Sequence, residues 1–195
     1  LRLIAGLEQV TAGEIRIGGQ RVNDVPPWQR RVAMVFQGSV LYPHWTVEQN
    51  LLFGWEAGSG SWLGRRLTDW WRGSGRVPSD VRDRVRQSAK LLGIEHLLDR
   101  YPRQLSGGER QRVALGRALV RQPAVFLLDE PWSHVDDATR RQVRDELRHC
   151  REQAGGAMVL VTHDHEDARA VGDRVAVMAA GRVSQVGVPD EVFGS

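Results

Sequence analysis

Three short apolar runs dominate the hydrophobic pattern of the chain, at residues 32–36, 125–128 and 158–161. Each run is nearly continuous and rich in strand-forming side chains, which is typical of parallel strands buried on both faces of a sheet. The pattern therefore predicts an α/β fold with a mainly parallel core sheet, drawn from residues 1–37 and 124–195.

Polar residues of catalytic type follow each apolar run. Gln37 follows the first run, Asp129 and Glu130 follow the second, and Thr162 and His163 follow the third. One such residue after a strand is more often a loop cap than a catalyst, but three such strand ends in one chain argue against coincidence. Because ligands bind beyond the carboxyl ends of parallel strands, we expect these side chains to converge on one crevice.

Two further segments alternate or turn in the manner of antiparallel strand pairs. Residues 13–22 surround Gly18-Gly19, and residues 175–186 surround Ala180-Gly181. We expect the second pair to close the core sheet. Between the sheet regions, residues from about 81 to 122 predict a mainly helical subdomain.

The start of one helix is marked by a capping box. In Ser106-Gly107-Gly108-Glu109, the serine hydroxyl can accept from the backbone N–H of the glutamate, whose carboxylate can reach back. The two glycines remove side chains from the first turn, so free N–H groups can approach an anion such as a phosphate. Pro123 stops the helix.

Residues 55–76 form an apparent insertion rich in tryptophan and bracketed by glycine-serine segments. Leu63, Leu67, Trp70 and Trp71 follow helical spacing, which indicates a short amphipathic helix. A lid packed on the helical subdomain is the favoured interpretation, and contact with a membrane interface or a transmembrane partner is the alternative.

Composition is consistent with one domain over residues 1–195. At 41% hydrophobic content the chain can bury a sizeable core, and its single cysteine, Cys150, excludes an internal disulfide and favours a reducing cytoplasm. No apolar run reaches about 18 residues and no signal-peptide pattern is present, so the sequence predicts neither a membrane span nor a secretory address. The net charge of +3 is small, which argues against a nucleic-acid partner.

Two longer motifs resemble those of ABC-type ATPases. Residues 105–112 read L-S-G-G-E-R-Q-R, and residues 125–131 read V-F-L-L-D-E-P. Residues 3–8 resemble the helix after a phosphate loop, and 35–37 with 41–44 resemble the Q-loop region. The resemblance covers nearly the whole chain and is strongest to ATP-binding subunits of sugar importers. It implies a P-loop NTPase-like fold and coupling of ATP hydrolysis to solute import.

The same resemblance implies roles for individual residues. Asp129 would help to hold Mg²⁺, and Glu130 would act as general base toward the attacking water. Gln37 would touch Mg²⁺ or that water and report the nucleotide state to the membrane subunit. His163 would contact the γ-phosphate as the switch histidine.

Other implied roles concern partners. Ser106, Gly107 and Gly108 would complete the ATP site of an opposite protomer, in a homodimer or with a paired ATPase subunit. Asp136, in the segment S-H-V-D, would keep the D-loop role although His134 departs from the usual pattern. The resemblance further implies transmembrane permease subunits, indirectly a solute-binding protein, and a peripheral place on the cytoplasmic face of the membrane.

The phosphate loop G-x-x-x-x-G-K-[ST] is absent from the 195 residues. Of the 27 lysine and arginine residues only Lys90 is a lysine, and no glycine cluster precedes it. We therefore expect an N-terminally incomplete ATPase domain that is inactive by itself. A catalytically inactive fragment and a non-transport ABC ATPase, of the DNA-repair or translation-factor type, are the alternatives.

Overall fold

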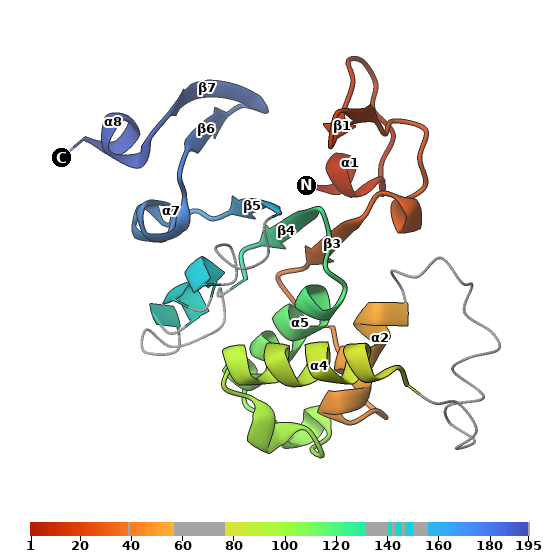
Figure 1. Cartoon of the computed structure of the whole chain (residues 1–195). Helices are drawn as coiled ribbons and strands as arrows, with labels where there is room; N and C mark the ends of the chain where they lie inside the picture. Colours follow the sequence, from red (N-terminus) through yellow and green to blue (C-terminus); the bar gives the residue numbers. More distant parts are fainter. Residues whose placement is uncertain are drawn as a thin grey trace.

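Three parallel strands form the centre of the fold in the computed structural model (Figure 1). They are β3 (Val32–Val35), β4 (Val125–Asp129) and β5 (Ala157–Val161), in the order β3-β4-β5. All three predicted parallel strands are thereby confirmed. The structure describes residues 1–38, 40–56, 77–131, 140–141, 143–145, 147–149 and 156–194.

Alternate residues of the strands face two different cores. Ala33, Val35 and Phe126 belong to the larger cluster of buried side chains, whereas Val32 and Leu127 belong to a smaller cluster on the other face. Because side chains alternate across a strand, β3 and β4 are buried on both faces, as their continuous apolar sequences predict.

Two hairpins accompany the parallel sheet, each pairing antiparallel. β1 (Arg16–Ile17) pairs with β2 (Gln20–Arg21), and β6 (Val175–Ala179) pairs with β7 (Arg182–Gly187). Residues at the turns adopt positive φ, +58° and +79° at Gly18 and Gly19 and +49° and +75° at Ala180 and Gly181, which is the conformation tight hairpins require.

The second hairpin does not close the core sheet, and that prediction is wrong. Among the described residues, β6 and β7 form a separate two-stranded sheet. The chain leaves β5 through α7 (His165–Val171), and the hairpin then packs with α8 (Pro189–Phe193) instead of adding to the edge of β5 (Figure 1).

A group of helices lies below the sheet in Figure 1. It contains α2 (Val47–Glu56), α4 (Ser79–Leu91) and α5 (Gly107–Val120), with 3₁₀ turns at Glu95–Leu97 and Pro102–Gln104. The helical group therefore includes α2 in addition to the predicted segment from about 81 to 122. Helix α2 begins with a T-x-x-Q capping box, in which Thr46 N donates to Gln49 Oε1 at 2.8 Å.

Glycines allow α2 and α5 to approach closely. A Cβ at Gly54 of α2 would lie 2.1 Å from the backbone oxygen of Arg117 of α5. A Cβ at Gly116 would lie 2.7 Å from Leu51 Cδ2. The lack of a side chain at Gly54 and at Gly116 thus lets the two helices approach closely.

At the N-terminal end, a buried arginine holds several segments together. The Arg30 guanidinium donates to the backbone oxygens of Leu3, Ile4, Asn23 and Val25 over distances of 2.7–3.1 Å. These bonds join α1 (Arg2–Ala5) to the loop after β2 and to the turn before the 3₁₀ helix Pro27–Gln29. The arginine is only 5% exposed, so these four acceptors replace its water.

Several sequence predictions fall outside the described residues. The insertion predicted at 55–76 begins inside α2, whose last two residues are Trp55 and Glu56, while 57–76 are not described. Asp136, His134 and Cys150 also lie outside the described part. In the part that is described, no helix is both long and apolar enough to cross a membrane.

Candidate functional site

The carboxyl ends of the parallel strands bring three predicted site residues together. His163 Nδ1 lies 2.9 Å from Glu130 Oε1, and Gln37 Nε2 donates to Glu130 Oε2 at 3.5 Å. Gln37 comes two residues after β3, Glu130 directly after β4 and His163 two residues after β5. Gln37, Glu130 and His163 thus lie close together, as expected for residues at the ends of parallel strands, and the Glu130 carboxylate contacts the other two side chains.

Glu130 takes up its position through an unusual backbone. Its φ is +42°, in the left-handed region that non-glycine residues seldom adopt. Its N–H donates to the backbone oxygen of Val161 at 3.0 Å, at the end of β5. Residues held in this region tend to occur at functional sites, where the surrounding structure supports the strained conformation.

The carboxylate of Glu130 changes the acid–base behaviour of His163. The hydrogen bond and the negative charge of Glu130 raise the pKa of His163, and Asp164 adds to this effect while Arg140 opposes it. The His163 side chain is 77% exposed, so it is accessible to a ligand. An imidazole that holds its proton more firmly is suited to contact an anionic phosphate.

Asp129 is the last residue of β4 and is partly exposed. Its register partner is Val161 of β5, which places it at the same sheet edge as Glu130 and His163. The carboxylate oxygens of Asp129 and the amide oxygen of Gln37 are the kind of donor that Mg²⁺ prefers, so the residues present fit that ion. Among the described residues, no group of three or more His, Cys, Asp or Glu side chains is arranged so that it could hold a metal ion.

The predicted capping box is present at the start of α5. Glu109 N donates to Ser106 Oγ at 3.2 Å, and Ser106 N donates to Glu109 Oε2 at 2.6 Å. The second bond lowers the pKa of Glu109. Gly107 and Gly108 form the first two positions of the helix. Within the described ranges, no hydrogen bond or ion pair joins Ser106 to the Glu130 group.

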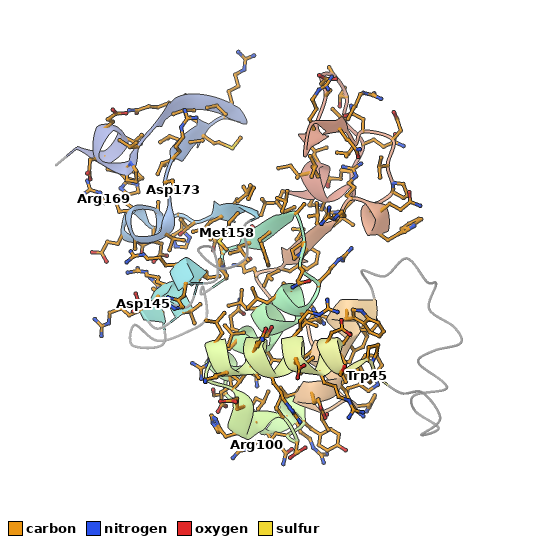
Figure 2. All side chains as sticks on the ribbon, in the orientation of Figure 1. Trp45, Arg100, Asp145, Met158, Arg169 and Asp173 are labelled. Atoms are coloured by element: carbon orange, nitrogen blue, oxygen red, sulfur yellow. The ribbon has the colours of Figure 1, made fainter. Side chains whose placement is uncertain are left out.

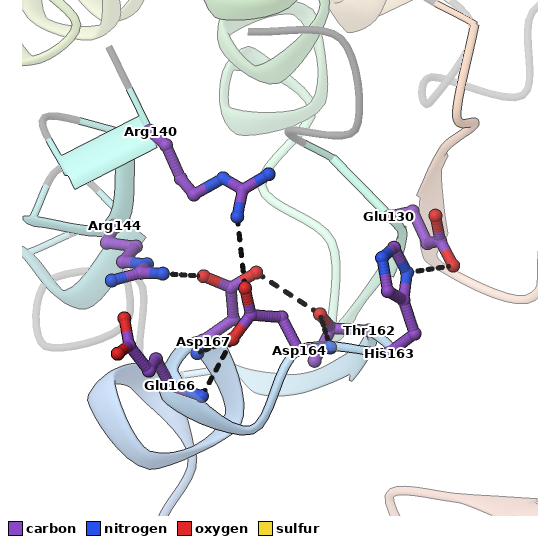
Figure 3. A network of polar contacts seen from close by, with 8 residues as sticks. All are labelled: Glu130, Arg140, Arg144, Thr162, His163, Asp164, Glu166 and Asp167. Carbon is purple, nitrogen blue, oxygen red and sulfur yellow. Dashed lines mark hydrogen bonds and ion pairs between the residues drawn. The ribbon is translucent and has the colours of Figure 1, made fainter. Parts of the chain in front are cut away.

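Sequence reasoning missed the polar network behind His163 (Figure 3). Arg140 Nη1 donates to Asp164 Oδ2 at 3.0 Å, and Arg144 forms an ion pair with Asp167. Asp164 also caps α7 by accepting from Glu166 N at 2.8 Å. The signals were two arginines at i and i+4, and an aspartate directly before a helix.

A second residue that sequence reasoning missed is Asn50, which is fully buried in α2. Its Oδ1 accepts from Tyr42 N at 2.8 Å, and its Nδ2 donates to the backbone oxygens of Tyr42, Trp45 and Thr46. The side chain therefore shapes the 42–46 loop, where Tyr42 lies 4.3 Å from Trp45 and 4.8 Å from Phe53 between ring centroids.

With this geometry established, comparison with known proteins decides the family. The sequence profile described as "ABC transporter" matches residues 1–133. The chain belongs to the ABC transporter family. This confirms the resemblance found from residues 105–112 and 125–131.

Among curated ABC relatives, SmoE of Agrobacterium fabrum, a sulfoquinovosyl glycerol transport ATP-binding protein, is 46% identical over 193 residues. These cover 99% of this chain and 49% of SmoE. The maltose/maltodextrin import ATP-binding protein MalK of Escherichia coli is also 46% identical over 193 residues, covering 99% of this chain and 48% of MalK. The chain thus spans about half the length of the curated relatives it matches.

Solved ABC structures confirm the α/β fold. The structure of cbiO1 from Clostridium perfringens, part of the ABC transporter complex cbiONQ, has a TM-score of 0.78 at 28% identity, covering 98% of this chain and 72% of that one. A dimer of the ATP-binding cassette MJ0796 in a post-hydrolysis state, bound to ADP and Pi, has a TM-score of 0.75 at 26% identity, covering 96% and 78%.

Proposed function

We propose that this chain supplies the ATP-hydrolysing part of an ABC importer for a sugar or another small solute. The observation that carries the proposal is the contact of Gln37 and His163 with one carboxylate, that of Glu130, at the ends of three parallel strands. The printed names of SmoE and MalK, both transport or import ATP-binding proteins, support import of a sugar-type solute.

In this proposal the three side chains divide the chemistry of phosphoryl transfer. Glu130 accepts a proton from the attacking water, for which its carboxylate must stay ionised. Gln37 orients that water through the amide that already reaches Glu130. His163 stabilises negative charge on the transferred phosphoryl group, because its pKa is raised beside Glu130.

Asp129 and Gln37 are the residues that would hold Mg²⁺ at this edge. The ion, when bound, neutralises charge on the phosphate oxygens. Asp129 reaches the site as the last residue of β4, one position before the proposed base. This arrangement keeps the metal-binding carboxylate and the proton-accepting carboxylate on adjacent residues.

The proposal includes a second ATP-binding chain. The start of α5 at Ser106, Gly107 and Gly108 would bind the nucleotide of that chain, because helix N-termini suit phosphate. Asp136, which lies outside the described residues, would contribute to the same nucleotide site. The dimeric cassette bound to ADP and Pi supports such a pairing. The pair is either a homodimer or two related ATPase subunits.

The remaining partners follow from the importer proposal. Transmembrane permease subunits would receive the coupling, and a solute-binding protein would act indirectly through them. The chain would then sit peripherally on the cytoplasmic face of the membrane, with no nucleic acid involved. The exposed side chain of Tyr42, in the loop that Asn50 shapes, is a candidate contact with the permease.

The test requires an extended chain, in which a strand and a G-x-x-x-x-G-K-[ST] loop precede Leu1. In this extended chain Glu130→Gln is expected to bind ATP normally and to hydrolyse it at least roughly a hundredfold more slowly, the usual scale for loss of a general base. ATP binding and phosphate release measured on the same preparations separate the two effects.

Glu166→Gln is the matched control, because Glu166 is exposed on α7 and its side chain does not contact Glu130 among the described residues. It should leave turnover within about twofold, as surface substitutions normally do. Turnover of Glu130→Gln within a few fold of the unsubstituted extended chain would remove Glu130 from the role of base.

A further inference from the structure

Two arginines on one helical stretch reach the turn that carries His163 (Figure 3). Arg140 and Arg144 stand one helical turn apart, in the helical residues between 140 and 149. Arg140 Nη1 donates to Asp164 Oδ2 at 3.0 Å, and Arg144 pairs with Asp167 Oδ1. Their spacing by four residues puts both guanidinium groups on the same side of the helix, facing α7.

The two carboxylates in turn hold the residues on either side of His163. Thr162 Oγ1 donates to Asp167 Oδ2 at 3.2 Å and accepts from Asp164 N at 3.1 Å. Asp164 Oδ1 accepts from Glu166 N at 2.8 Å and so fixes the first turn of α7. The backbone before and after His163 is therefore tied to carboxylates that the arginines neutralise.

The imidazole itself has little packing to fix it. The His163 side chain is 77% exposed, whereas Asp167 is 1% exposed and Arg144 is 14% exposed. Order in this region therefore comes from the buried network below the turn. The contact of His163 Nδ1 with Glu130 at 2.9 Å depends on where that turn is held.

We propose that Arg140 and Arg144 are positioning residues, which hold the 162–164 turn so that His163 meets Glu130. Neither arginine touches Glu130 in the described contacts: Arg140 acts through Asp164, which caps α7, and Arg144 acts through Asp167 of α7. An effect of the two arginines on ATP hydrolysis rests on the proposed function. Their effect on the contact between His163 and Glu130 does not. Figure 2 labels Asp145, from the same helical stretch, which is drawn below α7 in the orientation of Figure 1.

The first experiment uses the 195-residue chain without nucleotide and measures the titration of His163 by NMR. The variants are Arg140→Gln and the double variant Arg144→Gln/Asp167→Asn, which leaves no buried carboxylate unpaired. Arg148→Gln is the matched control, because Arg148 lies one turn further on the same helix and donates to the backbone oxygen of Ala170.

The direction in which the pKa of His163 changes shows whether Arg140 acts by positioning His163 or by its charge alone. The pKa of His163 is raised mainly by Glu130, and the positive charge of Arg140 lowers it. Loss of positioning in Arg140→Gln should therefore lower the pKa toward its ordinary value, whereas loss of charge alone should raise it. We expect a fall in both network variants and no change in Arg148→Gln. An unchanged or raised pKa in both network variants would overturn the proposal.

The second experiment measures steady-state hydrolysis in the extended chain. We expect Arg140→Gln to lower kcat at least about tenfold while KM for ATP stays within twofold, because misplacement of a catalytic group costs rate more than binding. Added to His163→Ala, the same substitution should lower kcat no further. An equal loss with and without His163 would show that Arg140 acts by another route.

The two experiments also separate two kinds of failure. If the extended chain itself hydrolyses no ATP, the proposed function fails, and the titration still decides whether the arginines position His163. Arg140→Lys adds a conservative variant that keeps a donor for Asp164, and partial rescue of the pKa and of kcat is expected. Absence of any rescue together with normal folding would contradict a role through this contact.

Discussion

At the scale of single residues, the site depends on how one carboxylate is shared. The Glu130 carboxylate accepts a hydrogen bond from Gln37 and contacts His163. The backbone of Glu130 is strained in this position, with a φ of +42°. The exposed imidazole responds to this carboxylate by holding its proton to a higher pH. Protonation of His163 is therefore linked to folding of the strand ends.

This linkage predicts how stability changes with pH. Because the pKa of His163 is raised above 6.5 in the folded chain, the folded state binds the proton more tightly than the unfolded state. The stabilising contribution is fully present below pH 6.5 and is lost as pH rises through the folded pKa. Urea unfolding of the parent and His163→Ala at pH values from about 5.5 to about 8.5 measures it.

The stability difference between parent and His163→Ala should shrink as pH increases over that range. His44→Ala is the control, because His44 is exposed in the loop before α2 and has no contact with the Glu130 group among the described residues. A difference that grows with pH would contradict the assignment of the Glu130 contact.

At the scale of elements, periodicity and caps carried most of what the sequence could predict. β3 and β4 were predictable because they are apolar and buried on both faces. β5 was predicted from the same apolar pattern but, at the edge of the described sheet, it is not buried on both faces, since Val161 is 41% exposed. The start of α5 was predictable because its capping box is local. Helix α2 was missed although its T-x-x-Q cap was visible at Thr46 and Gln49.

Other parts of the fold and site depend on contacts that sequence spacing does not encode. Arg30 donates to backbone oxygens, which every residue type possesses. No pattern of side chains therefore predicts these hydrogen bonds. Arg140 meets a carboxylate 24 positions away. The separation of the β6–β7 hairpin from β5 also depends on its packing with α8, which a strand pattern alone does not decide.

The crossing of α2 and α5 gives a prediction at this scale. An alanine in a helix is ordinarily more favourable than a glycine by about 1 kcal/mol. Gly54→Ala should nevertheless destabilise the chain by about 1–3 kcal/mol, because its Cβ would meet the backbone oxygen of Arg117, which cannot turn aside. Urea unfolding midpoints measure the effect.

Gly116→Ala provides the internal comparison for that prediction. Its Cβ would meet the end of the Leu51 side chain at 2.7 Å, and a side-chain end can move by a small rotation. We therefore expect Gly116→Ala to cost less than Gly54→Ala. The opposite order would mean that the α2–α5 contact is looser than the structure shows.

At the scale of the whole molecule, the helical group and the parallel sheet share one core. The larger hydrophobic cluster contains Val35 and Leu128 from the sheet together with Leu51, Val85 and Val113 from the three helices. The site lies at one end of this sheet, and the capping box of α5 lies on the helical group. The proposed proton-transfer groups and the proposed phosphate-binding helix start thus lie on two parts that share one hydrophobic core.

The absence of a phosphate-binding loop from these residues predicts how the whole chain behaves toward ATP. The 195 residues hold no G-x-x-x-x-G-K-[ST] loop. Positioning and electrostatic stabilisation supply nearly all of the catalysis in phosphoryl transfer, and the loop supplies the lysine, the N–H groups and a Mg²⁺-binding hydroxyl. Gln37, Asp129, Glu130 and His163 by themselves should neither hold nor hydrolyse ATP.

Calorimetric titration of the 195-residue chain with Mg-ATP should therefore show no binding tighter than about 1 mM, which corresponds to about −4 kcal/mol. The extended chain, measured in parallel, should bind far more tightly. Micromolar binding by the shorter chain would mean that another segment takes the part of the loop.

The left-handed backbone at Glu130 also sets a limit on how far this protein could be adapted to heat. A glycine at that position would relieve a strain of about 1 kcal/mol. Above the folded pKa of His163, where the contact with Glu130 no longer adds stability, selection for stability alone would therefore favour glycine. The same exchange would remove the proposed base. Any lineage or library screened only for survival at high temperature should therefore drift toward glycine at position 130, whereas one screened for turnover should retain the strained glutamate.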